Sequence, residues 1–275
     1  MVEPITTIGV GAIAAYLGSD GVQKLLGPTA EYLGSGLKDF VERRVATIGR
    51  MFHVAEVKLG AQLDQPGQIP PKVLKEILDE GSFANDDLAV EYLGGILASS
   101  RTEAGRDDRG ARIAKLVNRL STYQLRTHYL LYISVRNAFA ASGFNMGMID
   151  RPKMRMFIPF SGYSAAMDFS QAEQSEYENL LAHIFFGLHT EGLIEDAFLI
   201  APVEEIKKSL PAAAEGGVIF QPSALGTELF MWALGQSGLG MKIFDPSFAP
   251  AVDNMPNGIP GAKAVSDMLA AAAAQ

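Results

Sequence analysis

The sequence predicts a mainly α-helical protein in which a helical bundle precedes a smaller α+β unit. Three observations predict this fold class. Apolar residues recur at three- and four-residue steps over residues 28–63 and over shorter stretches of residues 70–141, a spacing typical of amphipathic helices. Helical and strand-like patterns alternate in residues 171–240. The composition, 48% hydrophobic and 20% charged over 275 residues, supports a sizeable folded core.

Residues 1–27 form an apolar N-terminal segment. Ile5–Leu17 is uncharged and mostly apolar but is shorter than the ~20 residues that a membrane-spanning helix needs. The flanking residues lack the basic character of a secretory signal. We expect a helix that docks on the core, followed by a short helix from Asp20 to Leu26. The alternative is a segment that inserts into a membrane or a partner after a conformational change.

Pro28 is well placed in the first turn of a long helix that we expect to run to about Leu63, with a break near Gly49 or Gly60. Such a continuous stripe favours self-association, although packing within the chain would use the same residues. A turn-rich linker follows at residues 64–71. The stripe comprises Leu33, Leu37, Phe40, Val41, Ile48, Phe52, Ala55, Leu59 and Leu63.

Residues 70–141 predict four helices with short connections. Pro70 and Pro71 open the first, which ends near Glu80. The other three are expected to start at Asn85 or Asp86, at Asp107 and Asp108, and at Ser121 or Thr122, the last running to about Ala141. Together with the long helix they form a helical body over residues 28–142.

Residues 143–170 are rich in Gly, Pro, Met and aromatic residues and predict a long loop or small hairpin with a strand at Met154–Phe160. The large apolar residues of this loop either fill gaps in the core or provide an adaptable contact surface. They are Phe144, Met146, Met148, Met154, Met156, Phe157 and Phe160.

Residues 171–240 have the element order of a winged-helix-like unit. A helix begins at Gln171 and ends in the sequence EGLI at residues 191–194, and a core helix covers Pro222–Leu234. Between them, strands at Phe198–Ile200 and Val218–Phe220 would form the wing as a short β-hairpin, with a helix to Leu210 after the first strand. Residues 241–275, with four prolines, are expected to form an extended tail with a fraying helical end.

The net charge of −8 is unevenly distributed along the chain. Residues 1–100 carry −5, residues 101–155 carry +7 and residues 156–275 carry −10. The basic middle segment either packs against acidic neighbours or binds an anionic partner such as nucleic acid or a phospholipid surface. The overall acidity disfavours non-specific binding to duplex DNA, which depends on phosphate neutralisation.

The most concentrated polar cluster, residues 99–110, lies in this basic segment at a junction between two predicted helices. Arg109 falls on the apolar side of its helix, so we expect a carboxylate to meet it, with Asp107 and Asp108 as candidates. Helix capping and surface ion pairs would explain the cluster without a ligand. The candidate residues for docking an anion or a partner are Arg101, Arg106, Arg109, Arg112, Lys115 and Arg119.

Familiar catalytic patterns are absent. The chain has no cysteine, which excludes disulfides, thiolate metal sites and cysteine nucleophiles. Its four histidines, His53, His128, His183 and His189, have neither metal-ligand spacing nor the arginine–histidine spacing of helical ribonucleases. Glycine-rich phosphate loops and nucleophile elbows are also missing. The sequence therefore predicts no catalytic residue, cofactor or metal site, and a protein that is not an enzyme.

The chain resembles bacterial Abi-alpha (abortive infection alpha) proteins in the order of several weak patterns spread over residues 22–235. These are the block Leu26–Gly34, the proline-led segment 70–100, the Leu120–Thr122 helix start, the EGLI turn and the S-x-x-G-x-x-L-F helix at residues 223–230. The resemblance implies a role in defence against phage, in which infected cells die or stop growing. It implies no catalytic residues.

Two functions follow as hypotheses. The first is a non-enzymatic abortive-infection effector that acts through a conformational change, which releases its apolar N-terminus or its Met-rich loop toward a membrane or a protein partner. The second is a nucleic-acid-binding or regulatory module that uses the basic stripe of residues 101–126. The expected wing is acidic over residues 191–205, which disfavours the second. The cysteine-free composition favours a cytoplasmic bacterial protein, with membrane association left open.

Overall fold

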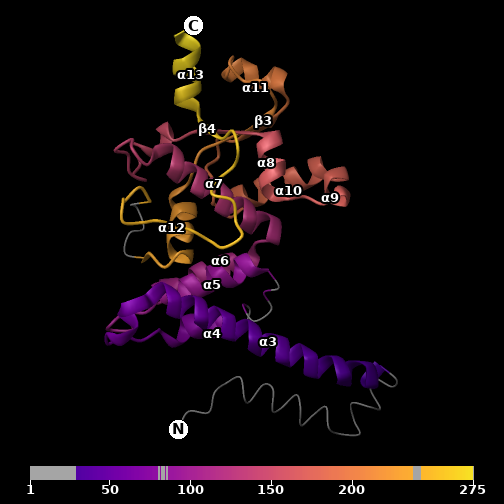
Figure 1. Cartoon of the computed structure of the whole chain (residues 1–275), viewed down its shortest axis with the longest axis vertical. Coiled ribbons are helices and arrows are strands. Elements are labelled where there is room, and N and C mark those ends of the chain that lie inside the picture. Colours follow the sequence, from indigo (N-terminus) through magenta and orange to yellow (C-terminus); the bar gives the residue numbers. More distant parts are fainter. Residues whose placement is uncertain (1–28, 80, 82–83, 85, 238–242, 275) are drawn as a thin grey trace. The chain divides into compact units, whose positions relative to one another are not determined.

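The computed structural model describes residues 29–79, 81, 84, 86–237 and 243–274, with side chains from Arg44 onward. The chain divides into two compact units, Met1–Thr47 and Ile48–Gln275. The expected N-terminal helices, at Ile5–Leu17 and Asp20–Leu26, lie outside the described residues. The described part is mainly helical, with eleven α-helices and a small antiparallel sheet in the C-terminal half (Figure 1).

The long helix expected from the apolar stripe is α3 (Thr29–Leu59), which extends from the first unit into the second. It continues through Gly49 without a break. It ends at Gly60, whose φ of +49° is left-handed and costs a glycine little, and a 3₁₀ helix, η1 (Gly60–Asp64), follows. Of the two expected break points, Gly60 is therefore confirmed and Gly49 is wrong.

The four helices expected over residues 70–141 are present, and their caps explain their starts. They are α4 (Pro71–Asp79), α5 (Asp87–Ser99), α6 (Arg109–Arg119) and α7 (Thr122–Phe139). The Asp86 carboxylate accepts a hydrogen bond from the Leu88 N–H at the start of α5. Ser121 and Gln124 form a reciprocal capping box at the start of α7.

The sheet has four strands in the order β2–β3–β1–β4. The expected strands appear as β1 (Met156–Pro159), β2 (Leu199–Ala201) and β3 (Gly217–Phe220). The pairing of β2 with β3 is antiparallel, as expected for a hairpin, but β3 also pairs with β1 on its other edge. The expected extended tail supplies β4 (Lys263–Ala264), a strand that no sequence pattern predicts.

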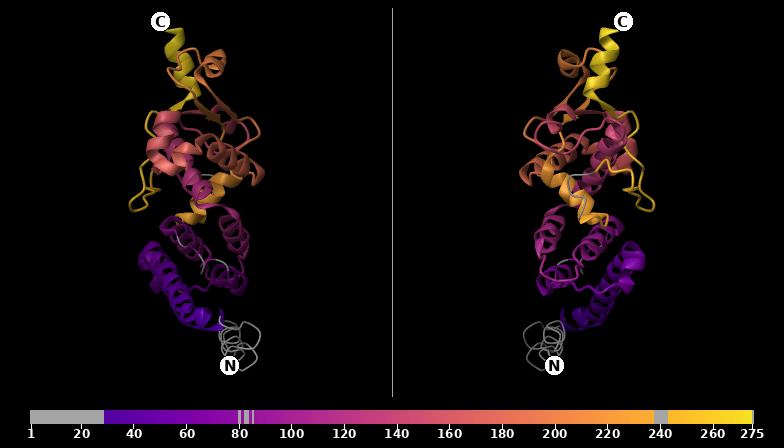
Figure 2. Two further views of the ribbon diagram at one scale, coloured as in Figure 1. Left: turned by 90° about the vertical axis from the view of Figure 1, so that its right-hand side faces the viewer. Right: turned by 90° about the vertical axis from the view of Figure 1, so that its left-hand side faces the viewer.

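Helices cover both faces of the sheet. On one face, a small apolar cluster joins the sheet to α11 (Val203–Ser209) and α13 (Val265–Ala273), which lie near each other in Figures 1 and 2. The opposite face, through Met156, Ile158 and Phe220, belongs to the main core. That core includes residues of α7, α8 (Phe160–Met167), α10 (Tyr177–Thr190) and α12 (Ala224–Ala233).

Three segments differ from their expected form. The helix from Gln171 is interrupted at Glu176, so that α9 (Gln171–Ser175) precedes α10. The Met-rich loop mostly fills the core, because Met146, Met154 and Met156 are fully buried, whereas Met148 is 78% exposed. The proline-rich tail is fixed to α7, where Arg136 donates to the Phe248 carbonyl and Asn137 to the Asn257 carbonyl.

None of the described helices is both long enough and apolar enough to cross a bilayer.

Helices α5 and α12 cross so closely that only glycine fits at position 95. A Cβ atom at Gly95 would lie 1.7 Å from the carbonyl oxygen of Ala233. We predict that Gly95→Ala lowers the free energy of unfolding by about 1–3 kcal/mol, because the helices must separate to admit a methyl group. Urea unfolding measures the change.

The matched control for this substitution is Gly49→Ala in α3, where no atom lies within 4 Å of the added Cβ. Since alanine favours an exposed helix over glycine by about 0.8–1.0 kcal/mol, this variant should be more stable than the parent protein. Equal effects of the two substitutions would contradict the close crossing at Gly95.

Candidate functional site

The predicted basic docking residues differ in the contacts that they make within the chain. Arg101 instead holds the segment that follows α3. Its guanidinium donates hydrogen bonds to the backbone carbonyls of Gln62, Leu63 and Gln65 at 2.8, 3.2 and 2.5 Å. These carbonyls lie at the end of η1, where a helix leaves acceptors without intrahelical partners, although that of Gln62 also accepts from the Gln65 N–H. Arg101 therefore acts as a structural clamp in the described structure.

Arg109 has the carboxylate partner that its position on α6 predicts. Its Nε and Nη2 atoms donate to Asp107, with Nη2 lying 2.6 Å from Oδ2. The hydrogen bonds from Arg109 hold the pKa of the Asp107 carboxyl below its usual value. On its other side, the guanidinium lies 5.4 Å from the centroid of the Trp232 ring. Arg109 thus joins the start of α6 to α12 through a cation–π contact.

Two further basic residues form ion pairs with acidic residues distant in the sequence. Lys115 lies 3.6 Å from Glu76 of α4, and Arg119 lies 2.8 Å from Glu191 at the end of α10. These contacts agree with the expectation that the basic segment packs against acidic neighbours. Arg106 and Arg112 are exposed and make no ion pair with a described residue.

A buried hydrogen-bond chain connects α5, α7 and α12. The Tyr92 hydroxyl lies 2.9 Å from Nδ1 of His128, and Nε2 of His128 lies 3.0 Å from the Gly226 carbonyl oxygen. Because a carbonyl can only accept, the imidazole carries its proton on Nε2 and accepts the Tyr92 hydroxyl at Nδ1. Tyr92 and His128 are both fully buried. The chain therefore fixes the neutral imidazole in one tautomer.

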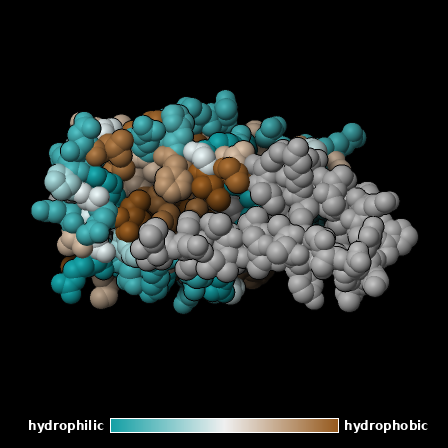
Figure 3. Space-filling view, turned by 90° about the horizontal axis from the view of Figure 1, so that it is seen from below, coloured by the Kyte–Doolittle hydropathy of each residue, from teal (hydrophilic) through white to brown (hydrophobic). Residues whose placement is uncertain are grey.

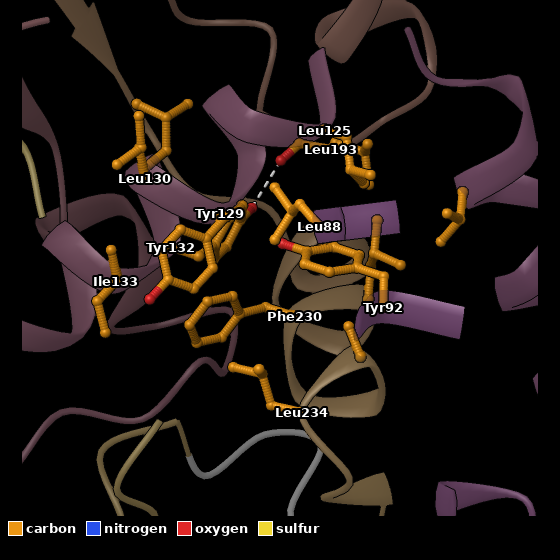
Figure 4. Packing of buried hydrophobic residues seen from close by; sticks show 14 of the residues in the cluster. Leu88, Tyr92, Leu125, Tyr129, Leu130, Tyr132, Ile133, Leu193, Phe230 and Leu234 are labelled. Carbon is orange, nitrogen blue, oxygen red and sulfur yellow. Dashed lines mark hydrogen bonds between the residues drawn. The ribbon is translucent and has the colours of Figure 1, made fainter. Parts of the chain in front are cut away.

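Aromatic rings surround this chain. Tyr129, Tyr132 and Phe230 pack together beside Tyr92, and the Tyr132 hydroxyl donates to the Leu193 carbonyl at 2.6 Å (Figure 4). Burial lowers the pKa of His128 from 6.5 to about 3 and raises the pKa of Tyr132. The site can hold polar groups in fixed positions, but it has no exposed nucleophile or base.

The role of His128 is not evident from the sequence. The signal that was available is its place between apolar and aromatic residues of a predicted helix, in the run Leu125–Ile133. A histidine with both neighbours buried on a helix needs polar partners from other helices. Their identity depends on tertiary contacts that the sequence does not reveal.

Exposed apolar side chains provide a second candidate site. In the second unit, Met51 and Ala55 of α3 are buried, whereas Phe52 is 43% exposed. Val57, which lies on another side of the same helix, is 66% exposed. At 100° per residue, Ile48, Phe52 and Leu59 lie within about 40° of one another on α3. Of these three residues Phe52 is the exposed one, since Ile48 is partly buried and Leu59 packs against the core. Figure 3 views the side of α3 and α4 and shows apolar side chains gathered on this face.

The described residues contain no group of three or more His, Asp or Glu side chains placed to hold a metal ion. Comparisons with protein-family models, curated proteins and solved structures give no match for this chain.

The depressed pKa of His128 predicts a loss of stability in mild acid. The unfolded chain takes up a proton near pH 6.5, whereas the folded protein resists it until about pH 3, so stability is complete above pH 6.5 and falls below it. Protonation of His128 in the unfolded chain should by itself lower the free energy of unfolding by about 2 kcal/mol between pH 7 and pH 5. Urea unfolding at the two pH values measures this drop.

The variant His128→Gln retains a donor and an acceptor but cannot titrate, so its drop between pH 7 and pH 5 should be smaller by about 2 kcal/mol. His189→Gln, which removes a partly exposed histidine, controls for histidine content. A pH dependence unchanged in His128→Gln would show that His128 is not held neutral by the fold.

The contact of Arg109 with Asp107 and Trp232 predicts a modest structural role. Arg109→Ala should lower the free energy of unfolding by about 0.5–1 kcal/mol, the size of an exposed cation–π contact. Arg112→Ala, on the same helix without an ion pair, should change it by less than about 0.5 kcal/mol. Thermal unfolding of both variants tests this difference, and equal stabilities would argue against a specific contact of Arg109.

Proposed function

We propose that this protein is a non-enzymatic effector of bacterial phage defence, similar to Abi-alpha proteins, and that it acts through self-association along α3. The observation that carries the proposal is Phe52, a residue of the apolar stripe that is 43% exposed on α3. Exposed apolar surface of this kind is typical of interaction sites, because a chain without a partner gains by burying it. The order of sequence patterns over residues 22–235 supports the defence role.

The position of the basic residues favours this function over nucleic-acid binding. Arg101, Arg109, Lys115 and Arg119 each contact another part of the chain. A cation that is already paired within the fold contributes less to phosphate binding, which depends on free positive charge. The winged-helix-like interpretation of α10, β2, β3 and α12 remains part of the nucleic-acid alternative, and the acidic residues around β2 weigh against it.

The N-terminal segment is the part of the chain that we connect with a second step. Its apolar run lies outside the described residues, and we propose that it engages a membrane or a partner once the protein has assembled. The assembly step through α3 can be tested independently of this second step.

The experiment compares phage plaquing on bacteria that express the parent protein, Phe52→Asp or Val57→Asp. Both substitutions place a carboxylate at an exposed apolar position of α3, but on sides of the helix about 140° apart. We expect the parent protein and Val57→Asp to reduce plaquing at least tenfold and Phe52→Asp to lose this protection. Sedimentation velocity should show that Phe52→Asp abolishes self-association, whereas Val57→Asp does not.

Two results would contradict the proposal. If the parent protein protects against none of a broad panel of phages, the defence role is wrong. If Phe52→Asp still associates and protects like the parent protein, the stripe of α3 is not the contact surface.

A further inference from the structure

Strand β2 is an outer strand of the sheet, and its outer edge is open in the described structure. The Phe160 N–H donates to the Gly216 carbonyl at 3.1 Å. Gly216 therefore bonds on the β1 side, and so does every second residue of β3 after it. Because an antiparallel strand bonds its two neighbours through alternate residues, Gly217 and Ile219 bond to β2. Their partners on β2 are Ala201 and Leu199.

Ile200, between these two residues, directs its N–H and carbonyl away from the sheet. No hydrogen bond joins either group to a described residue outside the sheet, so they are free to pair with another strand. Pro202 ends the strand directly after Ala201. The edge can therefore accept a short extended segment.

Apolar side chains lie on both faces of this edge. On one face, Phe186 of α10 is 58% exposed and its ring meets that of Phe198 at 5.4 Å in an edge-to-face contact. On the opposite face, Leu199 is 38% exposed. A strand added to β2 would place alternate side chains against Phe186 and Phe198 on one side and against Leu199 on the other.

The charge around β2 is acidic. Asp196 is fully exposed, and its carboxylate pairs with His189 at 2.9 Å. Glu204 is exposed and forms no ion pair with a described residue. Glu205 is paired with Lys208. Lys207 adds one further exposed cation on α11. The carboxylates closest in sequence to the strand, Asp196 and Glu204, are thus available to an added cationic segment.

We propose that β2 binds an extended, basic segment of a partner protein as an additional antiparallel or parallel strand. The main-chain groups of Ile200 supply hydrogen bonds, the exposed apolar side chains supply contact area, and Asp196 and Glu204 select lysine or arginine. This site is separate from the α3 surface and does not depend on the defence role.

The test uses fluorescein-labelled, acetylated heptapeptides and fluorescence anisotropy on the full chain. One peptide alternates lysine with valine, a second alternates glutamate with valine, and a third alternates lysine with proline. We expect the lysine–valine peptide to bind at least tenfold more tightly than either of the others. The glutamate peptide has the wrong charge. The proline peptide lacks the N–H of every second residue, and proline fixes φ at about −65°, away from the extended backbone of a strand.

Protein variants locate the binding site. Ile200→Pro removes the outward N–H and should weaken lysine–valine binding at least tenfold, whereas Ile200→Ala, which removes most of the same side chain but keeps the N–H, should weaken it less than threefold. Leu199→Lys changes only an exposed residue and should also weaken binding at least tenfold. Circular dichroism confirms that each variant is folded.

Three results would overturn the proposal. They are equal binding of the lysine–valine and lysine–proline peptides, no binding of any peptide, and binding unaffected by both Ile200→Pro and Leu199→Lys. If Leu199→Lys instead dissociates an oligomer of the parent protein, the occupant of the edge is a second copy of this chain, and the proposed basic partner is wrong.

Discussion

The buried imidazole of His128 is the constraint on which the rest of the core depends. It accepts from Tyr92 of α5 and donates to the Gly226 carbonyl of α12, while α7 carries the ring itself. An unpaired polar group at this depth would cost several kcal/mol, so the three helices can hold only the arrangement that satisfies both nitrogens. Where α5 and α12 cross, the absence of a side chain at Gly95 then lets the backbones of these two helices come into contact.

This fixed core positions the two surfaces that we connect with function. Helix α3 packs on α5 through Met51 and Val54, close to Gly94, and therefore presents Phe52 outward. Strand β2 pairs with β3, and β3 contributes side chains to the main core. The basic segment is not one of these surfaces, because most of its charged side chains make contacts within the chain.

The sequence predicted the parts of the fold that depend on local chemistry. The caps at Asp86 and Ser121 mark helix starts because a side chain satisfies nearby backbone N–H groups. The partner of Arg109 was also predictable, since Asp107 is two residues away. Strand β4 was missed because two residues carry no periodic pattern and pair only through the tertiary fold. The ion pair of Arg119 with Glu191 was beyond prediction for the same reason.

The most direct test of the buried constraint is the NMR titration of the His128 ring, with its nitrogens labelled with ¹⁵N. We expect one neutral tautomer, protonated at Nε2, to persist without titration from pH 8 down to about pH 4, since burial lowers the pKa to about 3. A midpoint near the ordinary value of 6.5, or a ring protonated at Nδ1, would contradict the hydrogen-bond chain that joins α5, α7 and α12.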